Sequence, residues 1–224
     1  MTPNRITLFA IFLAITIPAS AAVYTTTLIG VTSYNGSGSA PNFNAEFPVG
    51  SAWSATLQWD TAATPLSSTS TQAQFRLTEF ELTLYGENEN FTTAAVEDAA
   101  LFTITNYSGG SGDYHSIQFT TNYGTEYLTD STILDRTFLS LNITLEPIIP
   151  NGAASLTAPP ATLDPSLYDL ENSQTGLKVY MENLGWQNLP LTGTIDAIPE
   201  PSTYALMAGA VILGYAALRR RKAQ

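Results

Sequence analysis

Apolar and polar residues alternate with a period of two along most of the middle of the chain. Residues 53–60 place Trp53, Leu57 and Trp59 in one set and hydroxyl, amide or carboxyl side chains in the other, and residues 139–146 repeat the pattern. This period is that of strands with one buried and one solvated face. It predicts about nine strands, near residues 23–32, 43–49, 51–60, 74–85, 100–107, 114–121, 137–146, 176–183 and 191–197.

The predicted strands follow one another without intervening helices, which favours an all-β fold, an antiparallel two-layer β-sandwich. Within 74–85 the apolar positions change parity, so a bulge or bend is expected near Thr78. The Gly-rich segment Gly109–Asp113 predicts a hairpin loop. Residues 61–73 and 147–175 are polar or Pro-rich and form long connections.

The first residues have the order of a secretory signal peptide. A single cation, Arg5, precedes an apolar run over residues 6–17, and Pro18 ends that run. Ala19 and Ala21 supply the small side chains at −3 and −1 that a signal peptidase requires; a site shifted by one residue is the alternative. The run is shorter than the roughly 20 residues of a membrane-spanning helix. We therefore expect cleavage after Ala21 and a mature chain outside the cytoplasm.

A second apolar segment, residues 204–218, lies near the C-terminus and carries no charge. As a helix at about 1.5 Å per residue it is roughly 22 Å long, which spans a bilayer with snorkelling flanks. The basic cluster that follows should remain in the cytoplasm and stop transfer. The two ends together predict a type I topology before processing. The basic cluster consists of Arg219, Arg220, Arg221 and Lys222.

Pro199, Glu200 and Pro201 come directly before this apolar segment. The order of motif, apolar helix, basic cluster and chain end resembles the PEP-CTERM sorting signal of Gram-negative exoproteins. The resemblance implies recognition by a membrane-embedded exosortase, cleavage near the motif, and release or attachment at the cell surface. It divides the chain into a signal peptide (1–21), an extracytoplasmic β-domain (22–198) and a sorting signal (199–222).

Two other sorting signals compete with this interpretation. Residues 189–193 read L-P-L-T-G, the pattern of Gram-positive sortase substrates. They also alternate as a strand would, and a motif inside a strand is not accessible to a transpeptidase. A GPI signal should end with an apolar tail, whereas this chain ends in the basic cluster.

Charge and composition narrow the function further. Between residues 22 and 198 there are 3 basic and 18 acidic side chains, a balance of −15. A surface of this charge repels phosphate backbones, which argues against nucleic-acid binding. The chain has no Cys, so disulfides, thiolate metal sites and a Cys nucleophile are excluded.

Candidate catalytic or metal-binding residues are few. His115 is the only imidazole, and its position at a strand start favours a solvated or hydrogen-bonded residue over a general base. Glu79 and Glu81 lie on one strand face, where a glycosidase acid and nucleophile could stand, although a solvated polar face is the simpler explanation. Residues 87–90, E-N-E-N, are an oxygen-rich loop that suits calcium or an ordinary acidic turn. No catalytic residue, metal or cofactor is predicted.

The tryptophans raise the question of carbohydrate binding. Trp53 and Trp59 share the parity of Leu57 and are expected in the core, whereas Trp186 is free to act as a sugar platform. N-x-S/T triplets, which chance explains in a Thr-rich chain, begin at Asn35, Asn90, Asn106 and Asn142.

The sequence therefore predicts an exported, non-enzymatic structural or adhesive protein of the cell surface or biofilm matrix. Its expected partners are a signal peptidase, an exosortase, the membrane through residues 204–218, and extracellular polysaccharide. A carbohydrate-binding module and a secreted glycan hydrolase remain the alternatives.

Overall fold

The computed structural model describes residues 22–35, 41–109, 112–182 and 189–198. The all-β, antiparallel class is confirmed, with one short α-helix and two 3₁₀ turns within these ranges. The elements are β1 (Val23–Asn35), α1 (Pro41–Glu46), β2 (Ala52–Asp60), β3 (Ser67–Ser68), β4 (Gln72–Arg76), β5 (Glu79–Tyr85), β6 (Asn90–Ala94), β7 (Ala100–Gly109), β8 (Gly112–Thr121), η1 (Thr125–Tyr127), β9 (Thr132–Ile133), β10 (Arg136–Leu145), η2 (Pro165–Leu167), β11 (Gly176–Glu182) and β12 (Leu189–Ala197).

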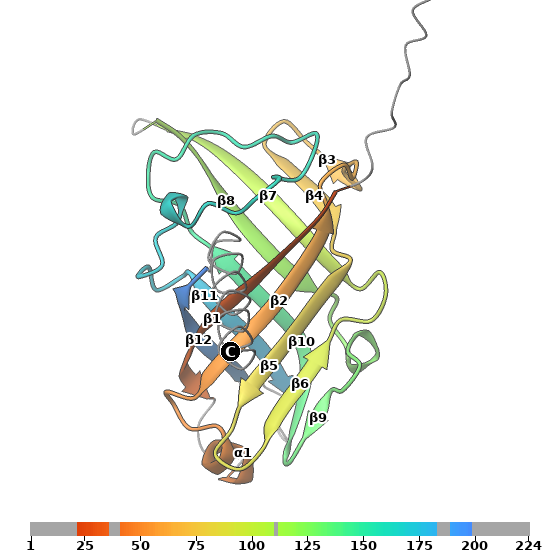
Figure 1. Cartoon of the computed structure of the whole chain (residues 1–224), viewed down its shortest axis with the longest axis vertical. Coiled ribbons are helices and arrows are strands. Elements are labelled where there is room, and N and C mark those ends of the chain that lie inside the picture. The colour runs from red at the N-terminus through yellow and green to blue at the C-terminus, as the bar shows by residue number, and fades with distance from the viewer. Residues whose placement is uncertain (1–21, 36–40, 110–111, 183–188, 199–224) are drawn as a thin grey trace, which may run out of the picture.

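One hydrogen-bonded sheet of 12 strands contains all of these strands, in the order β3-β4-β7-β8-β10-β11-β12-β1-β2-β5-β6, with β9 beside β10. The expected two separate sheets are therefore joined into one. The sheet folds over itself, so that β1, β2 and β5 pass in front of β7, β8 and β10 (Figure 1). Chain neighbours are often sheet neighbours, which is the pairing that short antiparallel connections produce.

Aromatic rings fill the space between the two halves of the sheet. Trp59 of β2 stacks on Phe119 of β8, with centroids 6.0 Å apart, and lies 5.3 Å from Phe102 of β7. Trp53 and Trp59 are both buried, as the strand parity predicted. Burial of large aromatic side chains supplies much of the hydrophobic stabilisation of a core.

The predicted strand at 43–49 is wrong, because helix α1 (Pro41–Glu46) extends into this segment. Phe43 and Phe47 alternate in sequence with polar residues, but they are also four apart, and a helical turn buries both rings together. Their centroids are 5.0 Å apart. The carboxylate of Asp135 accepts the backbone N–H groups of Asn42 and Phe43, 92 or more residues away in the sequence. Asp135 thus caps the N-terminus of the helix from a distant part of the chain, and the local pattern of apolar residues cannot predict such a contact.

The expected bend near Thr78 is present as the break between β4 and β5. Before the break the chain pairs with β7, and after it with β2. The N–H of Thr78 donates to the carbonyl of Gln58 at 2.8 Å, while the N–H of Leu77 donates to the carbonyl of Ala100 at 3.1 Å. One segment therefore contributes to both halves of the folded sheet. The short strands β3, β6 and β9 were not predicted.

Several predicted features lie outside the described residues. They are the signal peptide with Ala19 and Ala21, the side chain of Trp186, and the sorting signal from residue 199 onward. Within the part of the chain that the structure describes, no helix is long and apolar enough to cross a bilayer.

Candidate functional site

The folded domain ends where the predicted sorting signal begins. Strand β12 is hydrogen-bonded to β11 on one side and to β1 on the other. Its last residue, Ala197, is paired with Ile29, and the following Ile198 is only 5% exposed. The domain therefore holds the chain firmly up to the residue before the P-E-P motif, with no linker between them.

The competing sortase motif lies within this same strand. Residues 189–193 pair with β11 through Leu189 to Gly193, and Leu191 is completely buried. The hydroxyl groups of Thr192 and of Ser33 on the neighbouring strand β1 form a hydrogen bond 3.0 Å long. A strand that is hydrogen-bonded on both edges does not enter an enzyme cleft as a free peptide, so the structure argues against the sortase interpretation.

His115 lies at the centre of a hydrogen-bonded cluster. Its Nδ1 is 2.8 Å from the carbonyl oxygen of Gly152, and its Nε2 is 3.1 Å from the hydroxyl of Tyr168. Its backbone N–H donates to Oδ1 of Asn151 at 2.8 Å. The side chain is 7% exposed. Both ring nitrogens therefore hold the connection between β10 and β11 against strand β8.

Two asparagines reinforce this attachment. The Asn151 amide donates to the carbonyls of His115 and Leu167, each at 3.1 Å. Asn106 exchanges two hydrogen bonds with the backbone of Ala154, at 2.9 and 3.0 Å. Burial, and then the nearby Asp164 carboxylate, raises the pKa of Tyr168 above its ordinary value of 10.0. The long Pro-rich connection is thus an ordered part of the domain.

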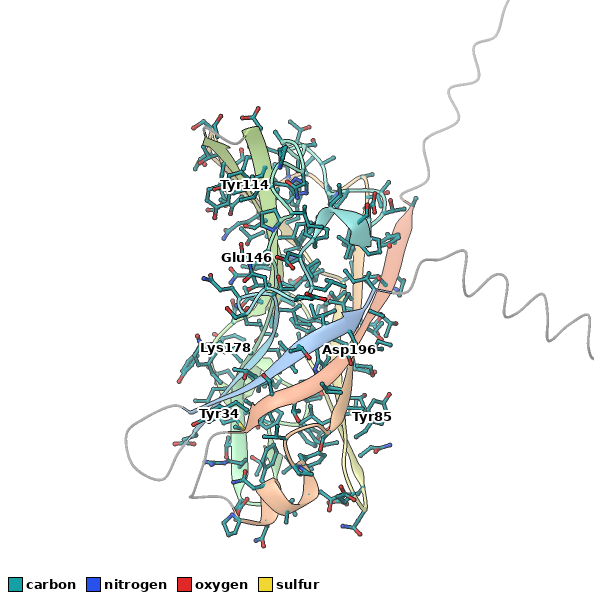
Figure 2. The ribbon with its side chains drawn as sticks, turned by 90° about the vertical axis from the view of Figure 1, so that its left-hand side faces the viewer. Tyr34, Tyr85, Tyr114, Glu146, Lys178 and Asp196 are labelled. Atoms are coloured by element: carbon teal, nitrogen blue, oxygen red, sulfur yellow. The ribbon has the colours of Figure 1, made fainter. Side chains whose placement is uncertain are left out.

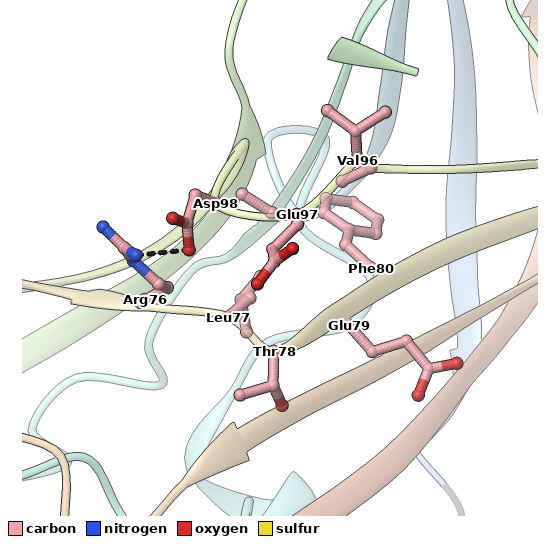
Figure 3. A pocket seen from close by; sticks show the side chains of 10 residues that line it. Arg76, Leu77, Thr78, Glu79, Phe80, Val96, Glu97 and Asp98 are labelled. Carbon is pink, nitrogen blue, oxygen red and sulfur yellow. Dashed lines mark hydrogen bonds and ion pairs between the residues drawn. The ribbon is translucent and has the colours of Figure 1, made fainter. Parts of the chain in front are cut away.

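Glu79 and Glu81 point outward from β5 and alternate with the buried Phe80 and Leu82. Glu79 borders a pocket of about 410 Å³, whose lining comes from residues 76–80, 95–98 and Ala100 and does not include Glu81. Figure 3 shows the Glu79 carboxylate turned away from the ion pair between Arg76 and Asp98. Only Glu79 therefore lines this pocket, whereas a pair of glycosidase carboxylates would face one cavity together.

The oxygen-rich loop at 87–90 closes around a carboxylate from another element. Glu46, at the end of α1, accepts the backbone N–H of Asn88 at 2.5 Å, that of Glu89 at 2.7 Å, and the Asn88 side-chain amide at 2.7 Å. These hydrogen bonds, with the Asn88 side chain first, hold the pKa of Glu46 below its ordinary value of 4.5. Among the described residues, no three His, Cys, Asp or Glu side chains are grouped to hold a metal ion.

A larger depression of about 820 Å³ lies over the outer face of the sheet, and sequence analysis did not predict it. We call it the polar groove. Figure 2 shows Glu146 and Lys178 on one side of the molecule, with Tyr114 above them. The groove is lined by Ser33, Gln118, Asn142, Thr144, Glu146, residues 171–178, Tyr180 and residues 192–194.

The polar groove draws its side chains from five strands that are distant in sequence. Register places Asn142 of β10 opposite Thr120 of β8 and Lys178 of β11, and Lys178 opposite Thr192 of β12. The sequence pattern predicted which residues of each strand face outward. It did not predict the order of the strands in the sheet, and this order decides which polar residues become neighbours.

Comparison with known proteins assigns the C-terminal signal. The family model described as the PEP-CTERM protein-sorting motif matches residues 197–222. The match confirms the suspected exosortase sorting signal, and it starts on Ala197, the last residue of β12. No curated protein and no solved structure matches the chain. The chain therefore carries the C-terminal sorting signal of an exported, exosortase-processed protein.

Proposed function

We propose that this chain is a non-enzymatic structural or adhesive component of the cell surface or biofilm matrix. The observation that carries the proposal is the direct joining of a rigid β-domain to the sorting motif matched at residues 197–222. In this proposal, signal peptidase cleaves after Ala21, residues 204–218 hold the chain in the inner membrane, and an exosortase then processes it near Pro199. Strand β1 begins at Val23, which is compatible with a mature start at Ala22.

The chemistry of the domain supports a passive role. Both ring nitrogens of His115 bind groups of the protein itself, and the carboxylate of Glu46 accepts hydrogen bonds from the loop at 87–90. The body carries 18 acidic against 3 basic side chains. Such a surface stays hydrated and soluble and suits contact with polysaccharide through divalent cations.

Fractionation in matched hosts tests this proposal. In a host without an exosortase, the full-length chain should remain in the inner membrane, with its signal peptide removed. In a host with the enzyme, a shorter form should appear at the surface or in the matrix. Recovery of the chain from the soluble cytoplasm in both hosts would refute the proposal.

Carbohydrate binding is the second candidate function, and the polar groove favours it. The Trp186 platform expected from the sequence lies outside the described residues. A glycan hydrolase is less well supported, because Glu81 does not line the pocket that Glu79 borders. Loss of reducing-sugar release on Glu79→Gln or Glu81→Gln would nevertheless establish it.

A further inference from the structure

We propose that the polar groove is a binding site for a neutral polysaccharide, an inference that rests on the proposed matrix function and specifies its ligand. The groove has a size at which small-molecule sites are found, roughly 300–1,000 Å³. Its volume is about 820 Å³.

The lining has unused hydrogen-bonding capacity. Hydroxyl and amide groups dominate it, and Thr144 donates to Oδ1 of Asn142 at 3.2 Å, which fixes the orientation of that amide. Within the described part of the chain, neither Nδ2 of Asn142 nor the Gln118 amide makes a hydrogen bond to the protein. Neutral donors and acceptors arranged over a sheet face match the hydroxyl groups of sugars, each of which both donates and accepts.

The floor also presents an aromatic ring beside a cation. The Lys178 ammonium lies 4.9 Å from the ring centroid of Tyr180, and these two residues are outward neighbours on β11. The contact holds the ammonium over the ring. Held there, the ammonium can donate hydrogen bonds to sugar hydroxyl oxygens.

Charge distinguishes a neutral ligand from an acidic one. The groove lining contains Glu146, Glu171 and a single cation, Lys178, so it is close to neutral. The surrounding body carries a balance of −15. In the absence of bridging divalent cations, a polyuronate would meet long-range repulsion from the body, whereas an uncharged glycan would not. Neutral polysaccharide is therefore the occupant that fits both the groove and its surroundings.

Affinity electrophoresis of the full-length chain in mild detergent tests this assignment. Gels contain dextran, galactomannan or laminarin as neutral probes, and polygalacturonate as the acidic probe. The wild-type chain should be retarded by at least one neutral glycan. The double variant Gln118→Ala/Asn142→Ala should bind that glycan at least tenfold more weakly.

The matched control is a double variant on the outer face of β5 and β6, outside the polar groove. Thr83→Ala/Thr92→Ala removes two hydroxyls, 2.9 Å apart, from this face, and should leave binding unchanged. Near-wild-type thermal unfolding of both double variants establishes that the fold is intact. Equal binding by the groove variant, retardation by polygalacturonate alone, or no retardation by any neutral glycan would overturn the assignment.

The fractionation experiment separates the two proposals. If the chain is exported, processed and retained in the matrix but binds no neutral glycan, the groove assignment fails and the matrix function stands. If the chain is never exported, the matrix function fails whatever the gels show.

Discussion

The Nε2 atom of His115 lies 3.1 Å from the hydroxyl of Tyr168, although 53 residues separate them in the sequence. The rings meet edge to face, with an interplanar angle of 88°. His115 belongs to β8, whereas Tyr168 follows η2 in the connection between β10 and β11. This contact explains why a Pro-rich segment without long strands packs as part of the domain.

Tyr168→Phe tests the contact through its pH dependence. Because the pKa of Tyr168 is raised in the folded state, the unfolded chain loses this proton near pH 10 while the folded chain retains it. The free energy of unfolding should therefore fall as pH rises above 10, and the variant should lose that contribution. At pH 7 the lost hydrogen bond should cost about 1–2 kcal/mol.

Urea unfolding at pH 7 and above pH 10 measures both effects. Tyr107→Phe is the control, since this ring is 43% exposed on the outer face of β7. If Tyr168→Phe and the wild type respond identically to alkaline pH, the buried hydroxyl is not coupled to folding.

Glu46→Gln should alter the acid side of the stability profile. The pKa of Glu46 is depressed in the folded state, so its contribution is complete above pH 4.5 and is lost as pH falls through the folded value. The variant should be less stable at neutral pH and should lose less stability on acidification. Chemical unfolding between pH 3 and 7 measures this. Glu89→Gln is the control, because Glu89 contributes only its backbone N–H to the cluster; equal acid slopes for Glu46→Gln and wild type would contradict the prediction.

Gly193→Ala should destabilise the domain by overpacking. A Cβ atom at this position would overlap Nε1 of Trp53 and lie 2.9 Å from the backbone oxygen of Val31. Since Trp53 is 1% exposed and fixed in the core, the expected loss is about 1–3 kcal/mol. Gly109→Ala, where a Cβ meets nothing within 4 Å, is the matched control. Thermal unfolding compares them, and an unchanged midpoint for Gly193→Ala would show that the indole can move aside.

The P-E-P motif should be required for processing and dispensable for folding. Glu200→Gln or Pro201→Ala should leave a heavier precursor in the membrane of a host with an exosortase, because the extended motif is the recognised peptide. Immunoblots of membrane and matrix fractions measure the precursor. Normal maturation of both variants would show that the match to residues 197–222 does not reflect use of the signal.

Neutral replacement of Arg219, Arg220 and Arg221 should also prevent processing, for a different reason. Without the basic cluster the apolar segment is no longer held in register across the membrane, and the tail moves outward. Protease protection of a C-terminal tag distinguishes this failure from the motif variants, which should keep the tail inside.

The sequence determined the longer strands and the direction of most of their side chains, because a period of two survives in any antiparallel arrangement. Trp53 and Trp59 were placed in the core on this basis, and the bend at Thr78 was expected from a change of parity. The same rule failed at Phe43 and Phe47, where a four-residue spacing suits either period and a distant carboxylate favours the helix. The sorting signal was also recognised from sequence, since its elements are consecutive.

Only the tertiary structure decided which distant residues became neighbours. Joining β10, β11 and β12 side by side brings Asn142, Lys178 and Thr192 into one groove. Folding the sheet over itself buries Trp59 against Phe102 and Phe119. Side-chain periodicity records the face of a strand but not the identity of the strand beside it, so the composition of a surface that crosses several strands is fixed only when they pair.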